Sequence, residues 1–217
     1  PRPILATIHT AALAGNLARA RAAAPGSRVW AVVKADGYGH GLLRAAAAFE
    51  AADGFALLEF DRAAVLRERY PGRRILMLEG PFAPADARQA VRERLDLVVH
   101  SVVQLDWIEE AARSAGVAPP MVWLKFDSGM HRLGFDARGI AVARDRLRAV
   151  EGVGDIGLMS HFANADRPGG IEPALGRIGD LMPWEAGPCS FANSAALLAS
   201  PVTHADWVRP GIMLYGG

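Results

Sequence analysis

The chain has 217 residues, and 51% of them are hydrophobic, which is enough for one sizeable core and within the size range of a single α/β barrel domain. The 24 basic and 23 acidic residues leave a net charge of +1, which excludes a field of one sign that would attract nucleic acid or an anionic membrane surface. No stretch reaches about 18 uninterrupted apolar residues, and Cys189 is the single cysteine, so neither a membrane span nor an intrachain disulfide is expected. We therefore expect one soluble, cytoplasmic domain.

Short apolar runs rich in β-branched residues alternate along the chain with stretches of Ala, Leu, Arg and Glu that have helical spacing. The predicted strands span residues 29–33, 55–58, 75–78, 95–99, 122–126, 156–160, 189–192 and 207–209. The predicted helices span residues 42–52, 61–69, 84–93, 102–115, 136–150, 171–184 and 194–199. Eight strands separated by helices indicate an α/β fold, a closed (β/α)8 barrel of the TIM type rather than an open doubly wound sheet.

The amino-terminal part of the chain carries two further predicted elements. Residues 4–9 have the pattern of a strand, and residues 16–24 have the pattern of a helix. The strand is surplus to the eight of the barrel, and an exposed strand edge is a site of unwanted pairing. The sequence therefore predicts a single-domain barrel with one additional N-terminal strand.

Polar residues repeatedly occur at the carboxyl ends of the predicted strands, which is where (β/α)8 barrels carry their functional residues. Lys34 ends the apolar run of residues 29–33 and is followed by a glycine-rich turn. Partial desolvation at such a position favours the free amine, which is the form that condenses with an aldehyde. A single lysine at a strand end is more often an ordinary surface residue, so the assignment depends on the residues around it.

Five ordered motifs extend the pattern around Lys34 along most of the chain. They are Lys-Ala-Asp-Gly-Tyr-Gly-His-Gly at 34–41, Leu-Lys-Phe-Asp-Ser-Gly-Met-His-Arg-Leu-Gly at 124–134, Ser-His-Phe-Ala-Asn-Ala-Asp at 160–166, Ala-Asn-Ser-Ala at 192–195 and Arg-Pro-Gly-Ile-Met-Leu-Tyr-Gly at 209–216. In sequence and in order they resemble the signatures of alanine racemases. The chain is similar to the N-terminal barrel of that family, which binds pyridoxal 5'-phosphate.

The resemblance implies a pyridoxal phosphate site at the mouth of the barrel, with alanine as the substrate. Lys34 would carry the cofactor and act as the base on one face of the substrate α-carbon. The cofactor phosphate would be held by the hydroxyls of Tyr38 and Ser194 and by the backbone amides of Gly211 and Ile212, and Asn193 would be a further cofactor-binding residue. Glycine at position 211 suits this role, because a residue without a Cβ lets backbone N–H groups approach a phosphate closely.

The same resemblance assigns roles around the cofactor ring. Arg209 would face the pyridine nitrogen, and because an arginine stays protonated it would leave the ring a weaker electron sink than a carboxylate would. His161 would stack or hydrogen-bond beside the ring, and Arg132 would bond the ring phenolate oxygen and the substrate carboxylate. Lys125 is predicted to point inward at the end of the fifth strand. In many members of the family the matching lysine is carboxylated, which implies an anion here that orients Arg132. Lys34, Arg132 and His161 are thus the predicted catalytic residues.

Racemisation by direct proton transfer needs an acid or base on each face of the α-carbon, and Lys34 supplies one. In alanine racemases the second is a tyrosine from the carboxyl-terminal β domain of the other subunit of a homodimer, and the first segment of the chain packs with that domain. The chain ends at Gly217, directly after the eighth predicted strand, so we expect the barrel without that domain. We expect it to bind pyridoxal phosphate but to racemise alanine poorly or not at all by itself. The full-length homodimer would either supply D-alanine for peptidoglycan or serve alanine catabolism, and the sequence leaves both roles open.

Three other functions are compatible with parts of the sequence. A non-catalytic carrier barrel for pyridoxal phosphate would explain the length, but not the pairing of residues 130–134 with Arg209. An amino acid decarboxylase on the same barrel would offer the ring nitrogen a carboxylate in place of Arg209. A cofactor-free isomerase would leave Lys34 as a structural residue. No metal is predicted, because the histidines show no spacing, with cysteine or carboxylates, that fits a metal site.

Overall fold

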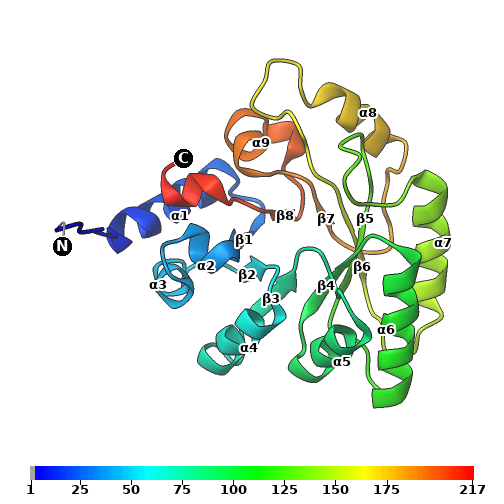
Figure 1. The fold of residues 1–217 in the computed structure, drawn as a ribbon. Coiled ribbons are helices and arrows are strands. Elements are labelled where there is room, and N and C mark those ends of the chain that lie inside the picture. The colour runs from blue at the N-terminus through cyan, green and yellow to red at the C-terminus, as the bar shows by residue number, and fades with distance from the viewer. Residues whose placement is uncertain (1–2) are drawn as a thin grey trace.

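The computed structural model describes residues 3–217, which form a closed barrel of eight parallel strands (Figure 1). The strands are β1 (Arg28–Val32), β2 (Gly54–Leu57), β3 (Arg74–Met77), β4 (Asp96–Val99), β5 (Val122–Lys125), β6 (Ile156–Met159), β7 (Cys189–Ser190) and β8 (Trp207–Val208). Each strand pairs with the next along the chain, and β1 also pairs with β8, which closes the barrel. The predicted (β/α)8 barrel and its eight strands are confirmed.

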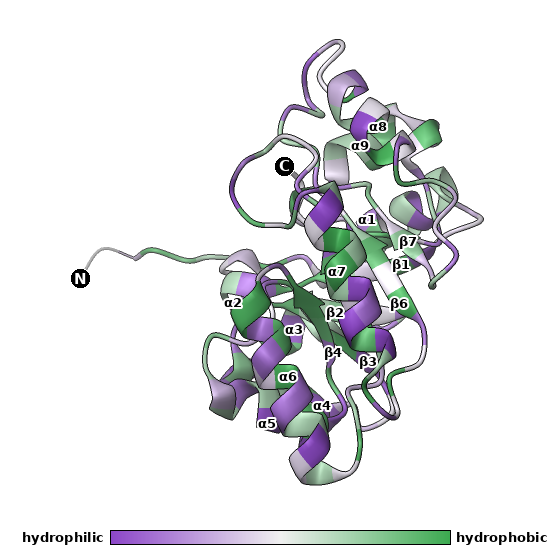
Figure 2. Cartoon of the chain, turned by 90° about the vertical axis from the view of Figure 1, so that its right-hand side faces the viewer, coloured by the Kyte–Doolittle hydropathy of each residue, from purple (hydrophilic) through white to green (hydrophobic). Residues whose placement is uncertain are grey.

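Helices cover the outside of this barrel. They are α1 (Thr10–Ala23), α2 (Lys34–Tyr38), α3 (Leu42–Ala48), α4 (Phe60–Arg69), α5 (Pro84–Glu93), α6 (Val102–Ala115), α7 (Ala137–Arg148), α8 (Glu172–Gly179) and α9 (Ser194–Ala199), with 3-10 turns η1 (Pro201–Thr203) and η2 (Ile212–Tyr215). Figure 2 shows predominantly apolar strands inside a layer of helices that carry both hydrophilic and hydrophobic residues. The bounds of α5, α6 and α9 are those predicted, whereas α8 ends well before residue 184, since Pro183 has no N–H to continue a helix.

Three buried tryptophans fill the interior of the barrel. Trp30 and Trp207 stack with their ring centroids 4.2 Å apart, and Trp123 belongs to the same cluster. Glycines on neighbouring strands make room for the rings, because a Cβ at Gly54 would overlap the Trp30 ring and a Cβ at Gly157 would overlap the Trp123 ring. Large side chains opposite small ones fill a barrel of this size completely. The interior is therefore a packed core, and the ligand site has to lie at the mouth.

The predicted surplus strand at residues 4–9 is wrong. Residues 3–9 have no regular secondary structure and project away from the barrel (Figure 1), with Ile4 and Leu5 exposed to 85% and 87%. A strand needs an edge to pair with, and a closed barrel offers none. The helix that follows is longer than the predicted 16–24, because α1 begins at Thr10.

Helix α1 packs against the other end of the chain. Leu13, Leu17 and Ala20 are buried on one face of the helix, and the Asn16 side-chain amide donates a hydrogen bond of 3.2 Å to the carbonyl of Leu214 in η2. Helix α1 and the turn η2, which lie near opposite ends of the sequence, therefore pack together close to β1 and β8, the strands that close the barrel (Figure 1). Among residues 3–217, no helix is long and apolar enough to cross a membrane.

Candidate active site

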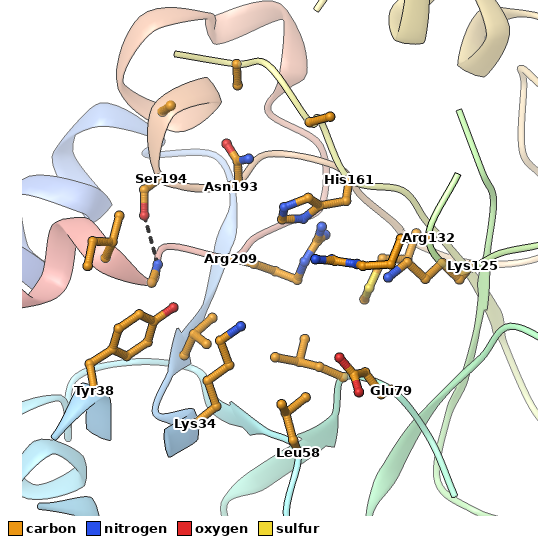
Figure 3. Close-up of a pocket in the computed structure, with 18 of the residues that line it drawn as sticks. Lys34, Tyr38, Leu58, Glu79, Lys125, Arg132, His161, Asn193, Ser194 and Arg209 are labelled. Atoms are coloured by element: carbon orange, nitrogen blue, oxygen red, sulfur yellow. Dashed lines mark hydrogen bonds between the residues drawn. The ribbon is translucent and has the colours of Figure 1, made fainter. Parts of the chain in front are cut away.

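The chain leaves β1 through a left-handed helical turn, α2. Ala35, Asp36 and Tyr38 have φ angles of 52°, 54° and 52°, a conformation that costs a non-glycine residue roughly 1 kcal/mol. The Asp36 carboxylate stabilises the turn by accepting a 2.9 Å hydrogen bond from the N–H of Leu42, at the start of α3. The sequence predicted a glycine-rich turn here, but not a left-handed conformation at three residues that have a side chain. The turn aims both Lys34 and Tyr38 at the barrel mouth (Figure 3).

A cavity of about 310 Å³ occupies this mouth, at the carboxyl ends of the strands. Its walls contain all the residues predicted to form the site: Lys34, Tyr38, Lys125, Arg132, His161, Asn193, Ser194, Arg209, Gly211 and Ile212. Figure 3 shows Tyr38 and Ser194 at one end of the cavity, Lys125 and Arg132 at the other, and the Lys34 amine pointing into the space between them. The structure thus brings together residues from most of the chain, while their individual roles remain predictions.

One end of the cavity is a cradle made by Tyr38, Ser194 and Gly211. The Ser194 hydroxyl accepts hydrogen bonds from the N–H groups of Gly211 at 2.9 Å and Met213 at 3.3 Å, which fixes the backbone of η2 against the start of α9. A Cβ at Gly211 would stand 2.5 Å from the Tyr38 hydroxyl oxygen. Hydroxyl groups beside a backbone that carries no Cβ are suited to a compact anion such as phosphate.

The opposite wall is built around the buried guanidinium of Arg209. Its nitrogens donate hydrogen bonds to the Ser190 hydroxyl at 2.6 Å and to the carbonyl of Ser160, so β6 and β7 hold it in place. Burial lowers the pKa of Arg209 to about 10, which still leaves it protonated at neutral pH. Together with Lys125 and Arg132, it makes this wall of the cavity strongly cationic.

The cationic wall changes the ionisation of two neighbours. Burial, reinforced by Arg209 and other nearby cations, lowers the pKa of His161 to about 3, so its ring is neutral at physiological pH. Burial also lowers the pKa of Lys125 to about 8, and the charges of Arg209 and Arg132 act in the same direction, while Glu79 and Asp127 oppose them. With this pKa, roughly a tenth of Lys125 is neutral at pH 7, far more than for an ordinary lysine.

Glu79 is a lining residue that sequence reasoning missed. It follows β3 at the barrel mouth, and Figure 3 shows its carboxylate on the side of the cavity that holds Lys125 and Arg132. The next residue must be Gly80, because its φ is +67° and a Cβ there would overlap the Val98 carbonyl oxygen. The rule that polar residues at strand ends are functional would have found Glu79, since it directly follows the predicted strand 75–78.

Asn193 lines the cavity, but its amide already has two partners. The side-chain oxygen accepts a hydrogen bond of 3.1 Å from the N–H of Ala196 and so caps α9. The side-chain nitrogen donates to the carbonyl of Phe162 at 3.0 Å. Asn193 therefore positions Ser194 and the segment after β6, which gives it a structural role beside its predicted contact with the cofactor.

Lys34 and Lys125 are the only two lysines in the 217-residue sequence, and the other 22 of its 24 Lys and Arg residues are arginine. Both line the same cavity. Histidine, cysteine and carboxylate side chains form no group of three within residues 3–217 that could hold a metal ion. The reactive groups that line this mouth are amines, guanidiniums, hydroxyls, the His161 imidazole and the carboxylates of Glu79 and Asp166.

The fold and this cavity define the class of protein: a (β/α)8 barrel with a lysine amine between an anion cradle and an arginine-rich wall. Residues 8–217 match the family model described as alanine racemase, N-terminal domain. The chain belongs to this family, as the motifs of the sequence predicted.

Individual relatives agree with the family match. The alanine racemase of Erwinia tasmaniensis is 49% identical over 99% of this chain, and that of Sodalis glossinidius is 48% identical over 100%. The crystal structure of biosynthetic alanine racemase from Pseudomonas aeruginosa superposes with a TM-score of 0.92 at 43% identity, covering 100% of this chain and 61% of its own. Alanine racemase from Streptomyces coelicolor A3(2) gives a TM-score of 0.86 at 37% identity, covering 95% of this chain and 58% of its own. The chain spans 60% of the length of both curated relatives.

Proposed function

We propose that this chain is the cofactor-binding barrel of a pyridoxal-phosphate-dependent alanine racemase, which interconverts L- and D-alanine. The observation that carries the proposal is that the Lys34 amine and the cradle of Tyr38, Ser194 and Gly211 open into one cavity. Family membership over residues 8–217 supports the same function. A ligand with an aldehyde at one end and a phosphate at the other suits a cavity that contains both an amine and an anion cradle.

The residues present fit pyridoxal phosphate. The cradle, with the backbone of Gly211 and Ile212, would hold the phosphate, and Arg209, which stays protonated, would face the ring. When bound, the cofactor would supply an electron-withdrawing ring that acidifies the substrate α-carbon. The neutral ring of His161 would lie beside the cofactor ring, and Arg132 would bind the carboxylate of alanine by charge-assisted hydrogen bonds.

Lys34 accepts and returns the proton on one face of the α-carbon, and a second group has to serve the other face. Tyr215 is not that group, because its hydroxyl donates a 3.0 Å hydrogen bond to the carbonyl of Val32 and its ring lies against Tyr38. We infer that the second group comes from a residue outside residues 3–217, on the partner subunit of a homodimer that carries a carboxyl-terminal β domain. This chain alone then binds the cofactor but racemises alanine slowly.

Carboxylation of Lys125 is part of the proposal. The neutral amine adds to carbon dioxide, a new N–C bond forms, and one proton passes to solvent, so a cation becomes an anion. Arg132 and Arg209 favour that change of sign, because both lower the pKa of Lys125 and would stabilise a negative charge in its place. The resulting carbamate would hold Arg132 toward the substrate carboxylate.

The biological setting is proposed from the same activity. D-Alanine made by the complete enzyme would supply peptidoglycan synthesis, and the reaction would take place in the cytoplasm. The single cysteine, Cys189, fits a reducing compartment, and burial raises the pKa of its thiol to about 12, which keeps it unreactive.

The two lysines make the test of cofactor attachment a sharp one. The chain is mixed with pyridoxal phosphate, reduced with borohydride and digested, and the peptide that gains the pyridoxyl mass is identified. The Lys34 peptide should be labelled, and Lys34→Ala should lose both the label and the imine absorbance band. Lys125→Ala is the matched control and should keep both. Labelling of Lys125, or of neither lysine, would overturn the proposal.

A racemisation assay tests whether the second acid or base comes from outside residues 3–217. A single enantiomer of alanine is incubated with the loaded chain, and its conversion to the other enantiomer is followed by optical rotation. We expect turnover orders of magnitude below that of a two-domain relative, because one face of the α-carbon lacks its acid or base. Turnover equal to that of the relative would place both groups within this chain and would contradict the proposed division of roles.

A further inference from the structure

We propose that Tyr215 is a positioning residue for the phosphate site: it holds the ring of Tyr38 so that the Tyr38 hydroxyl stays in the cradle opposite Gly211. The inference rests on the proposed function, because it gives that cradle a phosphate group to bind. It adds a residue at the end of η2 that does not line the cavity but on which the geometry of the cradle depends.

The contacts of Tyr215 are made on three sides. Its ring stacks on Tyr38, with centroids 4.7 Å apart and the planes inclined by 29°. His40 lies at 5.0 Å from the ring, and Phe49 packs against it edge-on at 5.4 Å. The hydroxyl donates to the carbonyl of Val32, the last residue of β1, at 3.0 Å. One side chain therefore ties η2, the turn after β1 and helix α3 together.

Tyr38 is a residue that needs such support. Its φ of 52° places it in the left-handed region, directly after Ala35, Asp36 and Gly37 in the same conformation. Strained backbone of this kind persists only where the surrounding structure holds it. Burial raises the pKa of Tyr38, so its hydroxyl stays protonated and can donate to a phosphate oxygen at neutral pH. The stack with Tyr215 thus holds the Tyr38 hydroxyl, which belongs to a strained segment, in position to donate to a phosphate in the cradle.

The cradle has two halves that come from opposite ends of the sequence. Tyr38 belongs to the turn after β1, whereas Gly211 belongs to the segment after β8, whose N–H is fixed by the Ser194 hydroxyl at 2.9 Å. Tyr215 follows Gly211 by four residues and reaches back to both Tyr38 and Val32. It is therefore placed to set the spacing between the two halves, which decides whether one phosphate can contact both.

The test compares two ligands that differ only in the phosphate. Dissociation constants of pyridoxal phosphate and of pyridoxal are measured for the wild-type chain, Tyr215→Leu and Tyr215→Phe. Loss of the stack in Tyr215→Leu should weaken pyridoxal phosphate about tenfold and leave pyridoxal unchanged. Tyr215→Phe keeps the stack and should lose roughly threefold or less, because only the hydrogen bond to Val32 is removed. Equal losses for both ligands would show a merely structural role and overturn the inference.

Two further variants isolate the route through Tyr38. In a Tyr38→Phe background the donor is already absent, so adding Tyr215→Leu should weaken pyridoxal phosphate no further. A full additional tenfold loss would mean that Tyr215 acts independently of Tyr38. Tyr70→Leu is the matched control, since Tyr70 is the third tyrosine of the chain and packs edge-on against Phe55 at 5.3 Å, and it should not change the ratio of the two affinities.

A measurement without ligand separates this inference from the proposed function. With three tyrosines in the chain, ring-labelled protein gives few resonances, and the wild type should show contacts between the rings of Tyr38 and Tyr215 by nuclear Overhauser effect. This measurement needs no variant to fold. Absence of the contact removes the positioning role even if pyridoxal phosphate binds at Lys34. Presence of the contact in a chain that binds neither ligand overturns the proposed function while leaving the stack itself established.

Discussion

The hydroxyl of Tyr38 lies directly over the backbone of Gly211. A Cβ built on Gly211 would stand 2.5 Å from the hydroxyl oxygen, 3.3 Å from the ring carbon that bears it and 3.6 Å from the Cβ of Val32. This close approach joins the segments that follow β1 and β8 at the cradle end of the cavity. The Tyr38 hydroxyl stands where a side chain at position 211 would lie, so only glycine fits there.

Gly211→Ala should therefore damage cofactor binding without unfolding the barrel. The new methyl group pushes Tyr38 out of the cradle, because the hydroxyl is on the far end of a side chain and can move whereas the backbone cannot. We expect pyridoxal phosphate to bind at least about tenfold more weakly, equivalent to about 1.4 kcal/mol, by absorbance titration. Gly176→Ala is the control, since a Cβ there meets nothing within 4 Å, and wild-type affinity for Gly211→Ala would refute the cradle.

Glu79→Gln should lower the pKa of Lys125 below its value of about 8. The Glu79 carboxylate raises that pKa by stabilising the ammonium, so neutralising it removes an attraction while Arg209 and Arg132 continue to repel the proton. Protein labelled with ¹³C at the lysine ε-carbon shows two side-chain resonances, and their titration in buffer free of carbon dioxide gives the value. Glu110→Gln, at an exposed carboxylate paired with Arg113, should leave the titration unchanged. An unchanged midpoint in Glu79→Gln would mean that the two side chains do not interact.

The strands and the site could be predicted because both have local causes. Parallel strands covered on both faces are continuous apolar runs, so the eight strands stand out as short stretches such as residues 122–126. Functional residues follow those runs directly, which is why the sequence alone places Lys34 and Arg209 at the barrel mouth. The order of the five motifs predicted which residues from widely separated segments line the same cavity.

The errors have causes that lie outside the local sequence. Residues 4–9 have a strand pattern, but whether a strand forms depends on an available edge, and the closed barrel provides none. The left-handed turn at Ala35 and Asp36 is held partly by a residue from another element, because the Ala35 N–H donates a 3.2 Å hydrogen bond to the Glu59 carboxylate, 24 residues along the chain. The stack of Tyr38 on Tyr215 joins residues 177 positions apart, a pairing that no periodicity reveals.

The buried ion pair of Asp96 with Arg74 should make stability depend on pH in an unusual direction. Burial raises the pKa of Asp96 to about 6, although Arg74 at 2.7 Å opposes the shift. The folded state therefore takes up a proton between about pH 6 and pH 4, where the unfolded state does not. Protonation of Asp96 therefore stabilises the folded state by at most about 3 kcal/mol. This stabilisation is complete below about pH 4 and is lost as the pH rises through about 6.

Urea unfolding at several pH values measures this effect. The difference in free energy of unfolding between the wild type and Asp96→Asn should change by up to about 3 kcal/mol between pH 4 and pH 6.5, with the wild type losing stability relative to the variant as pH rises. Asp106→Asn, at an exposed carboxylate that pairs with Arg146, is the control and should show a flatter difference. A difference for Asp96→Asn that does not vary with pH would show that Asp96 ionises as an ordinary carboxyl group.

Carboxylation of Lys125 should rise with pH and depend on the cationic wall. The reactive form is the neutral amine, whose fraction falls roughly tenfold for each pH unit below the Lys125 pKa of about 8. With ¹³C-labelled bicarbonate, we expect a carbamate carbonyl signal that is strong at pH 8.5 and weak at pH 6.5. Lys125→Ala should abolish the signal, and Lys34→Ala should retain it. A carbamate signal that survives Lys125→Ala would assign the modification to a different amine and leave Arg132 without its proposed orienting anion.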